Sequence, residues 1–106
     1  MITLIQQELW YLRKKIDLSN NPKKVELFAA FLENGGSLSQ EELIEKVYNI
    51  APYPRVSYRM WESAKTKMTK LISRTRLLTK KTGNHSIEWF PYDKENKTWS
   101  LYKLKD

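Results

Sequence analysis

Residues 27–48, LFAAFLENGGSLSQEELIEKVY, decide the fold because they contain the end of one helix, a turn and the start of the next helix. Asn34-Gly35-Gly36 ends the first helix, since glycine readily adopts the left-handed conformation that follows a last helical turn. Ser39-Gln40-Glu41-Glu42 then has the pattern of a capping box, in which Ser39 and Glu42 satisfy each other's free backbone amides. The stretch therefore predicts two helices joined by a tight turn.

The flanking residues set the other ends of these two helices. Asn21-Pro22 predicts a helix start, with asparagine as the N-cap and proline in the first turn, so the first helix is expected over 22–34. The second is expected to end near Asn49, because Ala51-Pro52-Tyr53-Pro54 stops it. The predicted buried residues are Val25, Phe28, Ala29 and Leu32, broadened by Leu27 and Phe31, and then Leu43, Ile44, Val47 and Tyr48.

The positive charge of the chain is concentrated in one segment. The 106 residues carry a net charge of +7, but Arg55–Lys81 alone contains nine basic residues and one acidic residue, Glu62. The remaining 79 residues hold ten basic and eleven acidic residues. A localised basic element suggests an anionic partner such as nucleic acid.

The same segment predicts a long amphipathic helix from about Val56 to Leu78. Its expected buried stripe consists of Met60, Trp61, Ala64, Met68, Leu71, Ile72, Thr75 and Leu78. The opposite side carries basic and hydroxyl side chains, with Leu77 as an apolar exception. A solvated helix face normally mixes both signs of charge, so a nearly acid-free face favours binding to phosphates and base edges.

Both ends of the chain predict β-strands. Trp10, Leu12, Ile16 and Leu18 recur at even positions of one expected strand, and Ile2–Ile5 is expected to pair with it. The stretches 86–92 and 98–103 are rich in aromatic and β-branched residues and flank a polar turn, which indicates a β-hairpin. The prediction is one α+β domain over residues 1–106, with N-terminal strands, a three-helix core whose third helix is long, and a C-terminal hairpin.

Residues 27–48 also resemble the winged helix-turn-helix of OmpR/PhoB-type output domains of bacterial response regulators. The similarity comprises the leucine-rich helix, the Asn-Gly turn, the Leu-Ser-x-Glu-Glu-Leu helix start at residues 38–43 and the closing Val47-Tyr48 pair. Ile16-Asp17-Leu18-Ser19 resembles the family's strand leading into the first helix. The resemblance implies double-stranded DNA binding in bacterial transcription, with 59–76 as recognition helix, 87–102 as wing and 50–57 as a loop that can contact RNA polymerase.

These observations define a set of candidate site residues. Those expected to face bases or the groove are Arg59, Ser63, Thr66, Lys70, Ser73 and Arg74. Those expected to contact phosphates are Lys65, Lys67, Arg76, Lys80 and Lys81. Lys94 and Lys97 are expected to act from the wing turn.

Other chemistry finds little support. The chain has no cysteine, which excludes thiolate catalysis and fits a reducing, cytoplasmic compartment. His85 is the only histidine, and a metal or catalytic site would need further groups around it. Glu41, Glu42 and Glu45 are best explained by stabilisation of a helix start, with an acidic protein-docking patch as the alternative. We therefore expect no enzyme activity, cofactor, metal, membrane segment or small-molecule substrate.

The aromatic hairpin leaves an alternative open. Strand alternation places Ile87, Trp89, Trp99 and Leu101 on one face and Phe90, Tyr92 and Tyr102 on the other. One three-helix core cannot readily bury both faces, so one of them could serve as a protein-binding surface. The rival to DNA binding is a protein-interaction module that uses this hairpin.

Overall fold

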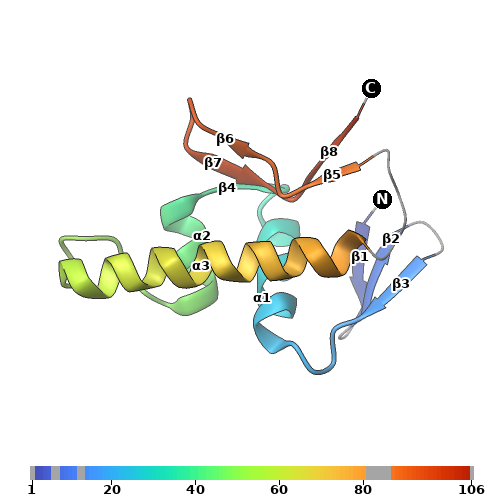
Figure 1. The fold of residues 1–106 in the computed structure, drawn as a ribbon, viewed down its shortest axis with the longest axis horizontal. Helices are drawn as coiled ribbons and strands as arrows, with labels where there is room; N and C mark the ends of the chain where they lie inside the picture. The colour runs from blue at the N-terminus through green and yellow to red at the C-terminus, as the bar shows by residue number, and fades with distance from the viewer. Residues whose placement is uncertain (1, 6–7, 12–13, 81–86, 106) are drawn as a thin grey trace.

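The computed structural model describes residues 2–5, 8–11, 14–80 and 87–105, and over these ranges the chain is an α+β protein with three helices and small antiparallel sheets (Figure 1). The helices are α1 (Pro22–Glu33), α2 (Gln40–Tyr48) and α3 (Tyr58–Thr79). The strands are β1 (Ile2–Ile5), β2 (Glu8–Tyr11), β3 (Lys14–Asp17), β4 (Ser37–Ser39), β5 (Ile87–Trp89), β6 (Tyr92–Asp93), β7 (Thr98–Ser100) and β8 (Tyr102–Leu104). The predicted order of terminal strands around three helices is confirmed.

The prediction of one continuous strand through residues 10–18 is wrong. The chain reverses after β2, and β1, β2 and β3 form an antiparallel sheet in that order. Leu9 pairs with Ile16 and both are buried, whereas Trp10 pairs with Lys15 on the opposite face. The reversal therefore separates Trp10 from Ile16, which simple alternation had placed on one face. Leu12 lies outside the described residues.

The helix ends follow the local sequence signals. Pro22 occupies the first turn of α1 and Asn21 the N-cap position before it, but Asn21 makes no side-chain capping hydrogen bond, so the side-chain cap expected there is not formed. Gly35 and Gly36, which follow the helix, have φ angles of 77° and 90°. In the capping box of α2, Ser39 Oγ accepts a hydrogen bond from the Glu42 amide, and Glu42 Oε1 accepts one from the Ser39 amide. Ser57 caps α3 by accepting from the Met60 amide.

The β4 strand was not expected from the sequence. Its three residues pair with β7, with Leu38 opposite Trp99, and produce a sheet in the order β4-β7-β6. Three residues are too few to show a periodic pattern, and Leu38 is equally explained by packing next to the helix start. This strand attaches the C-terminal hairpin to the turn between α1 and α2.

The predicted hairpin is present, but each of its arms is broken once. β5 pairs with β8 as a separate sheet, whereas β6 and β7 continue toward the turn. The break lies at Phe90, whose φ angle is 54°, and opposite it at Leu101, whose amide donates to Gly36 O at 2.9 Å. A left-handed residue in an arm changes the direction of the side chains that follow it.

This break resolves the question of the two aromatic faces. Phe90 is fully buried, and Ile87, Trp89 and Leu101 are buried as well. The alternation that placed Phe90 on the face opposite these three residues is therefore wrong at this position. Its ring lies 5.7 Å from that of Phe28 and 5.8 Å from that of Phe31, between centroids. The hairpin therefore supplies core residues from both of its predicted faces, and of the predicted Phe90, Tyr92 and Tyr102 face only the two tyrosines are exposed.

The core is a single cluster to which all three helices and both ends of the chain contribute. On α1 the buried residues are Leu27, Phe28, Ala30 and Phe31, whereas Leu32 is exposed and Val25 and Ala29 are half-buried. The predicted stripe was therefore rotated away from the true buried face. On α3, Met60 is 49% exposed and not buried as expected, because it lies at the edge of the buried side, whereas the adjacent Trp61 points into the core.

Candidate nucleic-acid interface

Helix α3 has one buried side and one solvent-exposed side, as the sequence predicts. Trp61, Ala64, Met68, Leu71, Ile72, Thr75 and Thr79 are buried. Two of these are polar, and their hydroxyls are satisfied within the helix: Thr75 donates to Leu71 O at 2.7 Å and Thr79 to Arg76 O at 2.9 Å. The buried side is thereby committed to the core, which leaves the other side to face solvent.

The six predicted groove residues come together on that exposed side. Arg59, Ser63, Thr66, Lys70, Ser73 and Arg74 are all exposed, and their spacing of three, four and seven residues places them along one face. From Arg59 to Arg74 this face is about 22 Å long at 1.5 Å per residue. Lys67, predicted as a phosphate contact, is exposed on one flank of it. We call these seven residues the basic face.

The hydroxyl of Thr66 is restricted by a hydrogen bond within the helix. Thr66 Oγ1 donates to Glu62 O at 3.0 Å. Because the hydroxyl proton is used there, the oxygen remains available as an acceptor. Thr66 is therefore suited to accept a hydrogen bond from an amino group on a base edge, whereas the basic residues around it are donors.

Lys65 is already paired within the protein. Its Nζ lies 2.7 Å from Glu62 Oε1, and this hydrogen bond is the main reason that the pKa of Lys65 is raised. Lys65 is half-buried, unlike the basic face residues. Its predicted role as a phosphate contact would first require separation from Glu62.

Arg76 is directed at the hairpin. Its Nε donates to Trp89 O at 3.2 Å, its Nη2 donates to Phe90 O at 2.7 Å, and its Cζ lies 6.0 Å from the centre of the Trp99 ring. Sequence reasoning assigned Arg76 to a phosphate, and the structure gives it partners inside the protein. Two further residues were predicted as phosphate contacts. Lys80 is exposed at the end of α3, and Lys81 lies outside the described residues.

The predicted wing lysines project from an ordered turn between β6 and β7. Lys94 and Lys97 are exposed. Asp93 holds the turn, because its carboxylate accepts hydrogen bonds from the Glu95 amide at 2.9 Å and from Asn96 Nδ2 at 2.7 Å. These bonds lower the pKa of Asp93, with the Asn96 side chain as the largest cause. The turn therefore presents its two lysines on a defined backbone.

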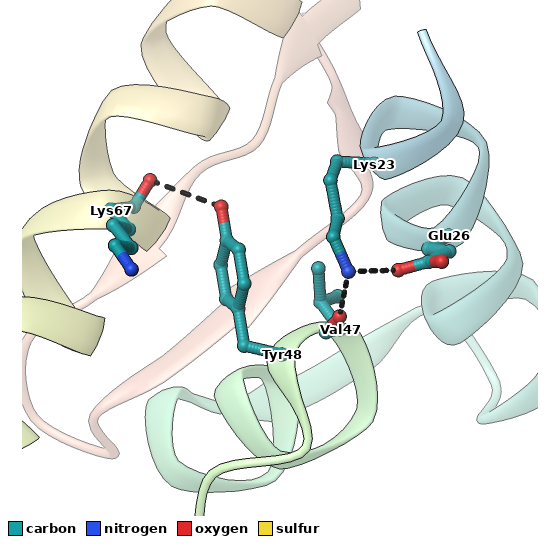
Figure 2. A network of polar contacts seen from close by, with 5 residues as sticks. All are labelled: Lys23, Glu26, Val47, Tyr48 and Lys67. Carbon is teal, nitrogen blue, oxygen red and sulfur yellow. Dashed lines mark hydrogen bonds and ion pairs between the residues drawn. The ribbon is translucent and has the colours of Figure 1, made fainter.

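A polar network that sequence reasoning missed holds the three helices together (Figure 2). Lys23 Nζ donates to Glu26 Oε2 at 2.9 Å and to Val47 O at 3.0 Å, and it lies 5.2 Å from the centre of the Tyr48 ring. Tyr48 in turn donates its hydroxyl to Lys67 O at 3.5 Å, and burial raises its pKa. The bond uses the Lys67 backbone, so it leaves the Lys67 ammonium available to the basic face.

A second feature that the sequence did not reveal is an exposed aromatic pair before the basic face. Tyr53 is 54% exposed and Tyr58 is 63% exposed, and their rings meet edge to face with centroids 5.6 Å apart. Tyr53 belongs to the loop between α2 and α3, and Tyr58 begins α3. Tyr53 lies in a loop, where no helical periodicity applies, so only the structure reveals its contact with Tyr58.

The described residues contain no group of three or more potential metal ligands, and His85 lies outside them. Over the same residues, none of the helices has the length and apolarity needed to cross a bilayer. Glu41, Glu42 and Glu45 are exposed on α2, where Glu42 completes the capping box. Comparisons with protein-family models, curated proteins and solved structures found no match.

Proposed function

We propose that this chain is a winged helix-turn-helix domain related to the OmpR/PhoB-type output domains, and that it binds double-stranded DNA sequence-specifically in bacterial transcription regulation. Helix α3 would enter the major groove, and the β6–β7 hairpin would act as the wing. The observation that carries the proposal is the basic face itself: four basic and three hydroxyl side chains exposed along about four turns of one helix. The three-helix arrangement with a small β4-β7-β6 sheet is compatible with this fold.

The chemistry of the basic face suits a duplex. Arginine and lysine donate to phosphates and to guanine edges, and threonine and serine contact bases or backbone. Arg59, Lys67, Lys70 and Arg74, together with wing lysines, could neutralise about four to six phosphates. At about −0.9 per phosphate, log K is then expected to fall against log salt concentration with a slope of about −4 to −5.

The decisive variant reverses the charge at the centre of the basic face. Lys70→Glu with Arg74→Glu is expected to weaken DNA binding on the order of 100-fold or more, because each good contact contributes about 1–3 kcal/mol. Both residues are exposed, so the melting temperature should stay close to that of the parent chain. Binding is measured by gel shift and by fluorescence anisotropy, first with random-sequence DNA and then with sites selected from it.

A matched control carries the same change in net charge elsewhere. Lys46→Glu with Lys105→Glu alters two exposed lysines on α2 and at the C-terminal end. This control should retain most of the affinity. Equal losses in both double variants would show that net charge alone attracts DNA, and a large fall in melting temperature for the basic-face variant would show that the face is structural.

The alternative is a protein-interaction module that uses the hairpin. The exposed part of its aromatic set is Tyr92, at 39%, and Tyr102, at 37%, since Phe90 is in the core. No shift of random-sequence DNA at low salt with tens of micromolar protein would favour this alternative. Selection of a defined DNA motif would instead establish sequence-specific binding.

A further inference from the structure

The C-terminal hairpin changes direction at one place, and this place is held from two sides. At the break, Phe90 takes a φ of 54° and is followed by Pro91. Across from it, the Leu101 amide leaves the ladder and donates to Gly36 O, on the turn that follows α1. On the other side, Arg76 of α3 donates to the carbonyls of Trp89 and Phe90. The direction of β6 and β7 therefore depends on contacts made at the break.

Arg76 is suited to fix a direction because its guanidinium is planar and its donors have a fixed geometry. Two of its five N–H groups bond two successive carbonyls, which defines the orientation of that peptide relative to α3. The Trp99 ring, on β7, lies 6.0 Å from its Cζ and packs on Tyr92 of β6 with centroids 4.7 Å apart. Arg76 thus contacts both arms of the hairpin. It donates hydrogen bonds to the arm that contains Trp89 and Phe90, and its guanidinium lies over the Trp99 ring of the other arm.

We propose that Arg76 is a positioning residue that sets the angle between the β6–β7 hairpin and α3, so that Lys94 and Lys97 reach the DNA backbone while the basic face occupies the groove. The inference rests on the proposed DNA-binding function. In this proposal Arg76 does not contact a phosphate itself but positions the two wing lysines that do. Removal of Arg76 should therefore remove the part of the DNA affinity that comes from the wing lysines and leave the part that comes from the basic face of α3.

The first test needs no DNA. Arg76→Gln is expected to speed hydrogen exchange at the Phe90 and Ser100 amides, which bond Leu101 O and Pro91 O across the break. Amides in the middle of α3 and in α1 should keep their protection. Arg74→Gln, two residues earlier on α3 and exposed, is the matched control and should leave the hairpin unchanged. Equal protection in Arg76→Gln and the parent chain would overturn the positioning role, whatever the fate of the DNA proposal.

The second test is a double-mutant cycle on DNA affinity as a function of salt. Lys94→Ala with Lys97→Ala is expected to flatten the log–log salt slope by about 1.8, at about 0.9 for each lost phosphate contact. Arg76→Gln should flatten it by a similar amount. Adding the two lysine changes to Arg76→Gln should then reduce affinity less than twofold further. Additive losses would instead show that Arg76 and the wing act independently.

Arg76→Lys separates positioning from charge. It keeps the positive charge but loses the planar fork, so a positioning role predicts the same flattened slope as Arg76→Gln. A slope equal to that of the parent chain would identify Arg76 as a simple phosphate contact and overturn the proposal. If the parent chain binds no DNA, the proposed function fails while the exchange result still decides whether Arg76 holds the hairpin.

Discussion

Residues of one type on α3 have different surroundings, depending on the side of the helix from which they project. Arg74 is exposed and Arg76 holds the hairpin, only two positions further along the helix. Met60 is half in solvent and Met68 is fully buried. Consecutive residues of a helix point in different directions, so the surroundings of an arginine or a methionine cannot be inferred from its residue type alone. They depend on which side of the helix carries it.

The same comparison shows which positive charges of this chain face solvent and which are paired within the protein. Sequence arithmetic assigns nine basic residues to residues 55–81. In the structure Lys65 and Arg76, two of the nine, have partners within the protein, whereas Arg59, Lys67, Lys70 and Arg74 lie on the basic face. The excess charge available to an external partner is therefore smaller and more directional than the count suggests.

The largest expected difference between the two sides concerns methionine. Met68→Ala should reduce the free energy of unfolding by about 2–5 kcal/mol, because a fully buried side chain is lost and a cavity remains. Met60→Ala should change it by no more than about 0.5 kcal/mol, since the side chain is 49% exposed. Urea denaturation of both variants measures the difference. Similar losses would mean that the first turn of α3 is packed against a surface in solution.

The next difference concerns arginine. Arg76→Ala should reduce the free energy of unfolding by about 1.5–3 kcal/mol, the usual contribution of hydrogen bonds that involve a charged group. Arg74→Ala should cost no more than about 0.5 kcal/mol, because its side chain is exposed. Thermal and urea unfolding of the two variants compare them directly. A stability loss at Arg74 that matches the loss at Arg76 would contradict the distinction between the two sides.

Local signals predicted the helices well because each end of a helix has its own chemistry. The capping box at Ser39, the glycines after α1 and the proline at its start all act over three or four residues, which a sequence displays directly. The exposed residues of the basic face on α3 were also predicted correctly, because helical periodicity repeats every three or four residues and can be seen directly in the sequence. What periodicity did not locate was the exact buried side of α1, where Leu32 is exposed and Ala30 is buried.

The strands were predicted less well because their pairing is not local. β4 is defined by its partner β7, 61 residues later at the Leu38–Trp99 pair, and its three residues contain no pattern. The break at Phe90 requires a left-handed φ at a phenylalanine, which no residue preference indicates. The role of Arg76 depends on that break, so it was also beyond sequence reasoning.

The smallest expected effect concerns Lys65, which lies between the two sides. Glu62→Gln removes its ionic partner, so the pKa of Lys65 should fall back toward its ordinary value while the lysine stays charged at pH 7. If the freed side chain then reaches a phosphate, the salt slope of DNA binding steepens by about 0.9. The slope is measured by anisotropy titrations over a range of salt concentrations, with the melting temperature as a check on folding.

Glu33→Gln provides the control for that change, because Glu33 is an exposed carboxylate on α1 and its loss alters net charge equally. A steeper slope in Glu62→Gln alone would place Lys65 at the edge of the basic face. Equal steepening in both variants would assign the effect to net charge. A flatter slope in Glu62→Gln would show that the ion pair orients the helix, and the boundary between the two sides of α3 would then have to include Glu62 among the residues that serve binding.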